Sequence, residues 1–297
     1  MKKLFFRISL FSLLIEVGTS PLRAFSLMLC AVVTFVLFFI FQYFASRKYQ
    51  ERLKAEYLLL YSLVGCSFFQ VPIRIWWFNN TLGSLPDFLF HLLGIVLGYL
   101  FYKSNKTFRI IILIFSLSSC FFLYFKGYDM WLHKLNYETF SGTIKDNNLE
   151  YNLTFQINTG DTLSLSDFKG KYLLLDCWYT YCGSCYRAMP KMQKLYDTHR
   201  ENNSIVVSSM HSYIKNVDKR LNDGKSKKED YTTGSEILKE EDCTYPCWAI
   251  DIENPILREL GVSVYPTVLI FDRQSNLIFR GNIENAERLI KKLLKEK

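Results

Sequence analysis

The chain has 297 residues, enough for two domains of ordinary size, and 49% of them are hydrophobic. The formal net charge of +8 arises in residues 1–126, which carry 13 Lys and Arg against 4 Asp and Glu, whereas residues 127–297 carry 23 against 24. No basic stripe with interleaved aromatic residues lies outside the hydrophobic region, which argues against nucleic acid as a partner.

The first part of the chain contains long apolar stretches that are typical of transmembrane helices. Residues 24–44 form an uncharged apolar run of 21 residues, about the length that a helix needs to cross a bilayer. Residues 8–22 contain Glu16 and could form a further span, an interfacial helix or the apolar part of a signal peptide. We therefore predict an all-α transmembrane region over residues 1–126 with four or five spans, the other candidates being 57–73, 88–102 and 110–125.

The basic residues between the predicted spans indicate the orientation in the membrane. The links 45–56 and 103–109 carry four and three Lys or Arg residues, whereas 74–86 carries only Arg74. Because links rich in Lys and Arg stay in the cytoplasm, the chain after residue 126 is expected to face away from it. The predicted location is the cell membrane, with lipid as a partner and the C-terminal part outside the cytoplasm, which is the periplasm in a Gram-negative bacterium.

Four residues within the predicted spans could be reactive. His91 is ionisable, which is costly at membrane depth and often marks function, but its place near Asp87 and a helix end favours an interfacial role. Cysteines at positions 30, 66 and 120 lie in three different spans. They could form an electron relay, yet cysteine is also an ordinary small apolar residue in such helices, and we favour that second interpretation.

The second part of the chain has the pattern of a soluble α/β domain. Residues 127–149 contain fewer apolar residues than the preceding spans and are predicted to be a membrane exit and linker. Residues 150–297 are predicted to form a mixed sheet flanked by helices. The predicted strands are 151–156, 162–165, 172–178, 204–209, 247–251, 266–271 and 276–281. The predicted helices are 183–199, 229–240, 254–260 and 283–296.

Two cysteines stand two residues apart where a predicted strand gives way to a predicted helix. The unpaired N–H groups and the dipole of a helix N-terminus stabilise a thiolate, so Cys182 is the candidate nucleophile. Cys185 lies one turn further on and could attack the mixed disulfide that Cys182 would form. A purely structural disulfide is an alternative, and so is a metal site, which would need two more ligands; we predict no metal site.

The residues around this pair resemble a known family. The stretch LSLSDFKGKYLLLDCWYTYCGSCYRAMPKMQKLY, with GVSVYPTVLIFD about 80 residues later, resembles the thioredoxin superfamily, and most closely its membrane-attached TlpA-like thiol-disulfide oxidoreductases. The resemblance covers residues 150–297 and implies a thioredoxin-like fold. It makes Cys182 the attacking thiol, Cys185 the resolving thiol, Asp176 the buried acid that deprotonates the resolving thiol through water, and Pro266 the cis-proline beside the sulfurs.

The same resemblance has further implications for the site. Pro190 matches the proline that kinks the active-site helix, and the substrate contacts are expected at Trp178, Tyr181, Tyr265 and Thr267. The family often has Trp where Tyr181 stands. Asp176 could instead be a strand-end acid that reaches solvent, although its position within LLLDCW favours burial and a raised pKa. Cys177 most simply fills an apolar position on the strand.

A second pair, Cys243 and Cys247, departs from the family pattern. In an extended chain the two residues would stand about 13 Å apart at roughly 3.3 Å per residue, too far for a disulfide, whereas a turn at Tyr245–Pro246 would bring them together. An oxidising compartment favours the bridge. We predict a structural disulfide here, with a second redox relay as the alternative.

The sequence therefore predicts a membrane-anchored, extracytoplasmic thiol-disulfide oxidoreductase that reduces protein disulfides. Its redox group would be the Cys182–Cys185 disulfide without any other cofactor, and its partners would be protein thiols and disulfides and an unidentified, membrane-bound electron donor. One alternative is a membrane scaffold that uses the domain only to bind partners. Another is a transmembrane electron conduit, which would require the membrane cysteines to react.

Overall fold

The computed structural model describes residues 2–145, 151–214 and 229–295. The chain forms two compact units, Met1–Leu132 and His133–Lys297. This division falls inside helix α7 (Tyr128–Tyr137), which occupies part of the predicted linker, and the last four linker residues, 146–149, lie outside the described residues. The domain boundaries at residues 126 and 149 stay predictions.

The first unit is entirely helical. Its helices are α1 (Lys2–Thr19), η1 (Ser20–Ala24), α2 (Leu27–Tyr49), α3 (Ala55–Trp76), α4 (Phe78–Thr81), η2 (Leu82–Ser84), α5 (Leu85–Lys103), α6 (Lys106–Phe122) and η3 (Leu123–Gly127), which leads into α7. Within the described residues, five helical stretches are long and apolar enough to cross a membrane: Lys2–Ala24, Leu27–Tyr49, Ala55–Trp76, Phe78–Lys103 and Lys106–Tyr137. The predicted all-α, multi-span class of this region is confirmed, and the ambiguous residues 8–22 lie in the first of these stretches.

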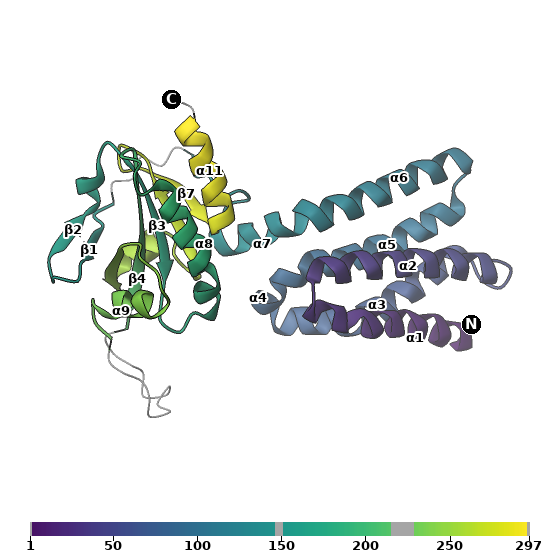
Figure 1. Ribbon diagram of the computed structural model, residues 1–297. Helices are drawn as coiled ribbons and strands as arrows, with labels where there is room; N and C mark the ends of the chain where they lie inside the picture. Colours follow the sequence, from purple (N-terminus) through teal and green to yellow (C-terminus); the bar gives the residue numbers. More distant parts are fainter. Residues whose placement is uncertain (1, 146–150, 215–228, 296–297) are drawn as a thin grey trace. The chain divides into compact units, whose positions relative to one another are not determined.

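Small residues let these helices approach closely. α2 packs along α5, and α1 packs along α3 (Figure 1). Gly94 and Gly98 stand four apart on α5, and a Cβ at Gly94 would lie 2.6 Å from the Phe35 carbonyl oxygen of α2. Between α1 and α3, Ser12 Oγ donates a hydrogen bond to the Ser62 carbonyl at 2.6 Å. Close backbone packing and interhelical hydrogen bonds are what hold helices together in lipid, where apolar burial offers little.

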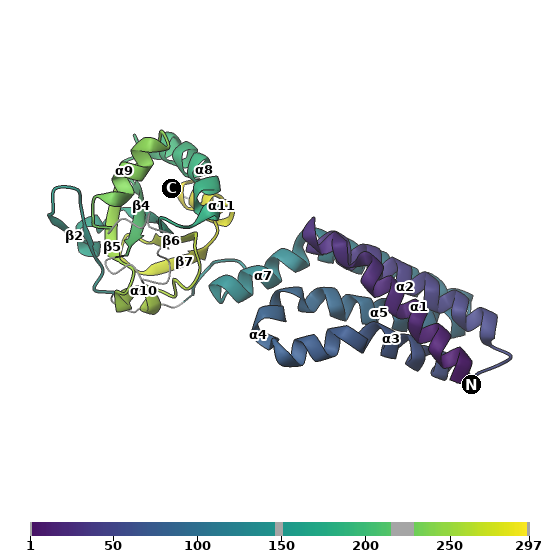
Figure 2. The ribbon, with the colours of Figure 1, turned by 90° about the horizontal axis from the view of Figure 1, so that it is seen from below.

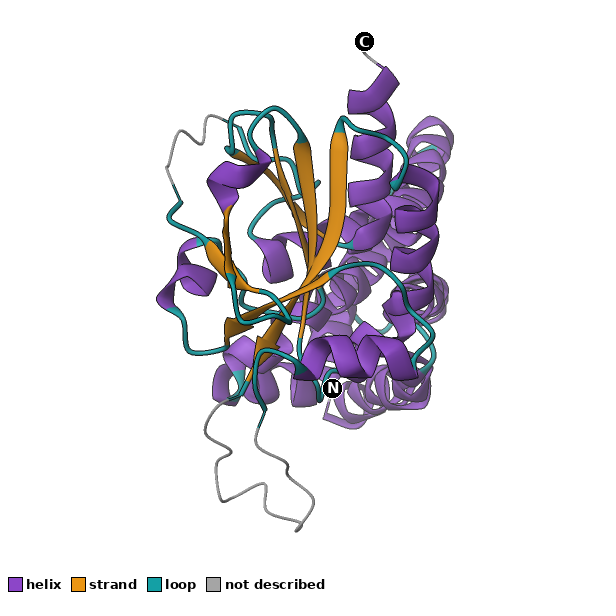
Figure 3. Ribbon diagram, turned by 60° about the vertical axis from the view of Figure 1, so that its left-hand side comes forward, coloured by secondary structure: helices purple, strands orange, loops and turns teal. Residues whose placement is uncertain are grey.

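The second unit is built around one mixed sheet of seven strands (Figure 3). The strands are β1 (Thr154–Gln156), β2 (Thr162–Ser164), β3 (Tyr172–Trp178), β4 (Ile205–Tyr213), β5 (Cys247–Asp251), β6 (Thr267–Phe271) and β7 (Leu277–Gly281). Their order is β2-β1-β5-β4-β3-β6-β7. β3, β4 and β5 are parallel, whereas β6 and β7 run antiparallel at one side and β1 and β2 at the other.

Helices cover both faces of this sheet. Its helices are η4 (Leu165–Phe168), α8 (Gly183–His199), α9 (Thr233–Glu240), α10 (Pro255–Glu259) and α11 (Ile283–Lys295). α8, α9 and α11 lie over one face and α10 over the other (Figure 2). The residues of β3 alternate between the two cores, with Leu174 facing α8 and Leu173 and Leu175 facing α10. The predicted thioredoxin-like arrangement of a mixed sheet flanked by helices is confirmed.

The segment after α7 is packed against this sheet, where the sequence predicted a linker. Ile144 N donates to the Ile278 carbonyl at 2.9 Å, and Thr143 forms a bridge with Phe279 of β7. Gly142 has a positive φ of 90°, and a side chain there would collide with the Phe279 ring. Residues 139–145 therefore extend the domain at the β7 edge, because their backbone groups find partners there.

Candidate active site

The cysteine pair lies where strand β3 turns into helix α8. β3 has the sequence YLLLDCW, and its last six residues are buried, so the strand is held in the middle of the sheet. Cys182 is the N-cap of α8, and its Sγ accepts a hydrogen bond from the Cys185 backbone N–H at 3.2 Å. A disulfide joins Cys182 to Cys185, with their Cα atoms 5.2 Å apart. When the disulfide is reduced, the same N–H group and the helix dipole favour the thiolate at Cys182.

The two sulfurs differ in their access to solvent and in their neighbours. Cys182 is 5% exposed and Cys185 is 1% exposed. Ser184 Oγ lies 3.3 Å from Cys182 Sγ and donates to the Tyr265 carbonyl at 3.4 Å. Cys182 is therefore the more exposed of the two cysteines, and Ser184 links its surroundings to the backbone of Tyr265.

The loop before β6 completes the surface around Cys182. The peptide bond between Tyr265 and Pro266 is cis, as the resemblance implied. The Pro266 carbonyl accepts a hydrogen bond from the Tyr137 hydroxyl at 3.1 Å, and the Tyr265 hydroxyl donates to Ser212 Oγ at 3.0 Å. Burial raises the pKa of Tyr265 to about 12, so this hydroxyl keeps its proton at neutral pH. These contacts fix the two residues of the cis peptide bond in place.

Asp176 lies on β3 beneath the active-site helix. Because side chains alternate along a strand, Asp176 faces the same side as Leu174 and Trp178, which pack in one core with Cys182 and Cys185. Asp176 is 2% exposed. Burial raises the pKa of this carboxyl from 3.8 to about 7, so at neutral pH it can take up or release a proton. The burial favours the proton-transfer interpretation of Asp176 over a solvated strand-end acid.

The expected substrate-contact residues differ in accessibility. Tyr181, directly before Cys182, is 54% exposed. The side chains of Trp178 and Thr267 are fully buried: Trp178 packs on the ring of His211 at 4.5 Å, and Thr267 Oγ1 donates to the Val264 carbonyl at 2.6 Å. The side chain of Tyr181 is thus accessible to solvent, whereas the side chains of Trp178 and Thr267 pack inside the domain, and the substrate contacts expected at these three residues stay predictions.

The predicted disulfide between Cys243 and Cys247 is not formed in the structure. Both are free thiols. Cys247 begins β5 opposite Ser209 of β4, and its Sγ packs so closely under α9 that a side chain at Gly234 would lie 2.8 Å from it. Cys243 Sγ instead approaches the Glu241 carbonyl at 3.5 Å. The register of β5 and the packing of α9 turn the two sulfurs toward different partners, although the chain bends at Tyr245, between the two cysteines.

Cys177 occupies an apolar position, as the sequence indicated. It is fully buried in the core on the α10 face of the sheet, opposite the core that holds the active-site pair. Burial, with a smaller contribution from the neighbouring charge of Asp176, raises the pKa of its thiol well above the usual value. A buried and protonated thiol is a poor nucleophile.

One residue at the site was missed by the sequence analysis. His211 of β4 is fully buried beside Trp178 on the neighbouring strand, and its Nε2 lies 3.0 Å from Thr180 Oγ1 in the loop before Cys182. Burial lowers the pKa of His211 to about 4, so the ring is neutral and supports the loop without adding charge. The predicted strand ended at residue 209, because the following residues, MHSY, show no alternation of apolar and polar side chains that would have signalled its continuation to Tyr213.

The fold and the paired cysteines define a thioredoxin-like domain of the thiol-disulfide oxidoreductase class. The protein-family model described as Redoxin matches residues 146–294, half of the chain. The thiol-disulfide oxidoreductase ResA of Bacillus thuringiensis subsp. konkukian is 25% identical over 194 residues, which cover 65% of this chain and 97% of that protein. The thioredoxin-like protein YneN of Bacillus subtilis is 30% identical over 80 residues, covering 27% of this chain and 47% of that protein.

Solved structures also resemble the C-terminal unit. The thioredoxin domain of a thiol-disulfide oxidoreductase from Bacteroides vulgatus has 16% identity and a TM-score of 0.39, covering 49% of this chain and 99% of that structure. The exposed lipoprotein thioredoxin Etrx1 of Streptococcus pneumoniae has 23% identity and a TM-score of 0.37, covering 49% and 98%. The chain belongs to the redoxin family, within the thioredoxin superfamily. The predicted enzyme class, thiol-disulfide oxidoreductase, is confirmed.

Proposed function

We propose that this protein is a membrane-anchored enzyme whose Cys182–Cys185 pair reduces disulfides of other proteins outside the cytoplasm. The observation that carries the proposal is the placement of the pair. Cys182 caps α8 beside the cis-Pro266 loop, and the buried Asp176 lies on the same face of the sheet as Cys185. These groups supply a nucleophile, a docking backbone and a base for one exchange reaction.

The exchange proceeds in two steps. In the reduced enzyme the Cys182 thiolate attacks one sulfur of a substrate disulfide, forms a mixed disulfide and releases the first substrate thiolate. Asp176 then accepts the Cys185 proton through water, and the Cys185 thiolate attacks Cys182 Sγ. The second substrate thiol leaves, and the Cys182–Cys185 disulfide forms again. Two electrons have passed from the enzyme dithiol to the substrate, so a separate donor must reduce the enzyme after each cycle.

The helical unit supports anchoring in a membrane. Its polar side chains Glu16, Asp87 and His91 are buried inside the helices, whereas large apolar side chains are exposed along α6, among them Ile114, Leu117 and Phe121. This inside-out distribution is suited to lipid as a partner. The basic links 45–56 and 103–109 favour an orientation that leaves the C-terminal unit outside the cytoplasm, where a membrane-bound electron donor would meet it.

Labelling of intact cells tests the nucleophile and the topology together. After mild reduction, a membrane-impermeant maleimide is expected to modify Cys182 first, as read by peptide mass spectrometry, because it is the more exposed of the two cysteines and caps the helix. The Cys182→Ser variant should lose this label and provides the control. First modification of Cys185 would refute the assigned nucleophile, and protection of Cys182 until the membrane is opened would place the domain in the cytoplasm.

The reduction potential tests the proposed direction. The C-G-x-C sequence together with a buried acid resembles reducing family members, so we expect a potential near that of thioredoxin, about −270 mV, rather than that of a strong oxidant, about −120 mV. Equilibration of the full-length protein with glutathione or dithiothreitol buffers, followed by alkylation of free thiols, measures it. A value near the oxidant end would reverse the direction of electron flow and leave the exchange chemistry intact.

A further inference from the structure

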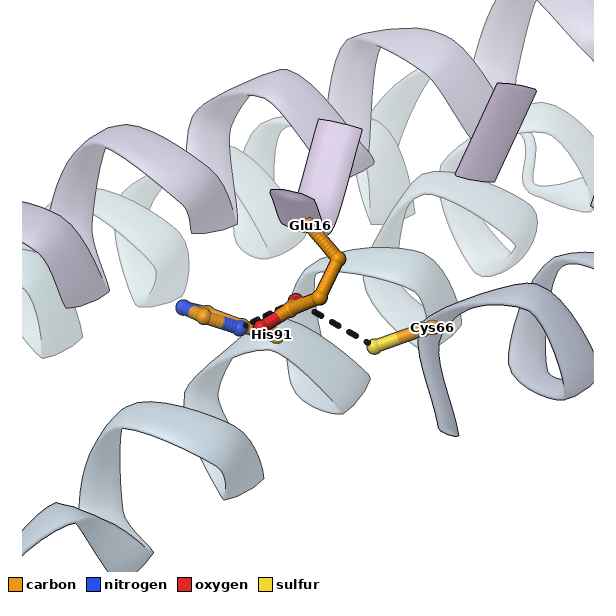
Figure 4. Close-up of side chains that lie close together, drawn as sticks. All are labelled: Glu16, Cys66 and His91. Carbon is orange, nitrogen blue, oxygen red and sulfur yellow. Dashed lines mark hydrogen bonds and ion pairs between the residues drawn. The ribbon is translucent and has the colours of Figure 1, made fainter. Parts of the chain in front are cut away.

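A cluster of buried polar side chains lies inside the helical unit. Glu16 of α1, Cys66 of α3 and His91 of α5 meet there, and one potential ligand atom from each lies within 4.8 Å of the other two (Figure 4). Glu16 Oε2 is 2.8 Å from His91 Nδ1 and 3.8 Å from Cys66 Sγ. All three residues are buried. Among the described residues, clusters of three or more potential metal ligands occur only in the helical unit, and none includes Cys182 or Cys185.

We propose that Glu16, Cys66 and His91 bind a thiophilic divalent cation of the zinc class. Zinc takes thiolate, imidazole and carboxylate ligands at about 2.0–2.3 Å, which places the ligand atoms of a tetrahedral site about 3.4–3.6 Å apart. The two distances to Glu16 Oε2 differ from this range by less than about 1 Å, so small side-chain movements suffice. Magnesium and calcium prefer oxygen ligands and do not suit a thiolate.

The neighbouring residues are arranged as a second layer around these ligands. Arg23 Nη2 and Gln70 both donate to Glu16 Oε1, which leaves Oε2 directed at Cys66 and His91. His91 Nε2 lies 2.8 Å from Asp87 Oδ1, an ion-pair contact rather than a well-aligned hydrogen bond. A metal-binding histidine usually donates its other ring N–H to a carboxylate, which orients the ring, and Asp87 lies within reach of His91 for that role. Arg23 also holds Asp87, at 2.7 Å.

Charge balance allows a divalent cation inside the low-dielectric bundle. Arg23 contacts Asp87 at 2.7 Å, so the charges of these two residues offset each other. A cation held by the Cys66 thiolate, the Glu16 carboxylate and a neutral His91 would have its two positive charges offset by its two anionic ligands. The cation therefore adds no uncompensated charge to the interior, which would be costly.

A second grouping, Cys30, Asp87 and His91, shares the other nitrogen of the same ring. Its atoms are already engaged, because Cys30 Sγ donates to the Thr19 carbonyl at 3.5 Å and Asp87 contacts both Arg23 and His91. Glu16 Oε2, in contrast, contacts His91 Nδ1 and Cys66 Sγ, which are the two other proposed ligands, so the Cys66 side is the proposed binding side. Cys30 is buried as completely as Cys66 and therefore provides a matched control.

Cobalt binding to the full-length protein in detergent micelles tests the proposal. The Cys182→Ser/Cys185→Ser background removes the active-site dithiol as a competing ligand. We expect one Co²⁺ per chain with a thiolate-to-cobalt charge-transfer band, which Cys66→Ser should abolish and Cys30→Ser should retain. Asp87→Asn should keep the band and weaken affinity by about 10–100-fold, the effect usual for a residue that orients a ligating histidine. Size-exclusion chromatography establishes that each variant is folded.

Two results would overturn the proposal. One is a folded background protein that binds no Co²⁺ with the charge-transfer band, in which case the cluster is an ion-pair network that joins α1, α3 and α5. The other is a band that persists in folded Cys66→Ser or that is lost in folded Cys30→Ser. Cys243 and Cys247 are present in every variant and cannot produce a difference between them.

Discussion

Replacement of Cys185 by serine is expected to trap covalent complexes with substrate proteins. Cys182 still attacks the substrate disulfide, but the intramolecular thiol that would resolve the mixed disulfide is gone. Because an oriented intramolecular group reacts far faster than a thiol in solution, we expect the lifetime of the complex to rise by at least about 100-fold. Non-reducing gels of membranes from cells that carry the variant, followed by mass spectrometry, measure the trapped species.

The matched control is Cys182→Ser, which retains Cys185 but lacks the attacking thiol. It should trap few or no complexes, because Cys185 is 1% exposed and cannot be reached by a folded substrate. All complexes should disappear on treatment with dithiothreitol. A membrane scaffold would behave differently, since it would keep the same non-covalent partners in both variants. Absence of reducible complexes in Cys185→Ser, with partner binding intact in a variant lacking both sulfurs, would support the scaffold instead.

Replacement of Asp176 by asparagine is expected to slow the resolution step by about 10²–10⁴-fold, the usual contribution of a positioned general base. Only the ionised carboxylate accepts a proton. Because burial raises its pKa to about 7, the wild-type resolution rate should climb as pH increases through 7, and the variant should lack this rise. Rapid-mixing measurements of mixed-disulfide decay between pH 5.5 and pH 8.5, a range of about three units around that pKa, give both profiles.

The first attack by Cys182 provides the internal control for Asp176→Asn. In the Cys185→Ser background, the rate at which the mixed disulfide forms should be unchanged by the Asp176 substitution, because the helix N-terminus activates that thiolate. Superimposable pH profiles of resolution in the wild type and Asp176→Asn would exclude Asp176 as the base.

A lower stability of the folded domain would not explain the slower resolution step expected of Asp176→Asn. The pKa of Asp176 is about 7 in the folded chain against an ordinary value of 3.8, so the folded state binds more protons than the unfolded state between these values. Stability therefore falls as pH rises through this window, by at most about 4 kcal/mol at pH 8. Asparagine carries no such cost, so the variant should be at least as stable as the wild type at alkaline pH.

Local patterns in the sequence were sufficient for most of the C-terminal unit. The predicted elements 172–178, 183–199 and 247–251 coincide with β3, α8 and β5. Apolar runs, helical periodicity and turn residues act within a few positions of one another, so they can be read along the chain. The cysteine pair at the start of a helix is also a local feature, and its chemistry follows from the helix terminus that Cys182 caps.

Tertiary structure alone decided how distant residues meet. Spacing allowed a bridge between Cys243 and Cys247, but both are free thiols in the fold, where the register of β5 and the packing of α9 direct the Cys247 sulfur to partners other than Cys243. His91 was expected to have an interfacial role, yet the packing of α1, α3 and α5 encloses it with Glu16 and Cys66. The sequence by itself determined which segments form strands and helices and where the reactive thiols stand. The contacts among segments 50 to 75 residues apart depend on helix packing and strand register, which no local pattern encodes.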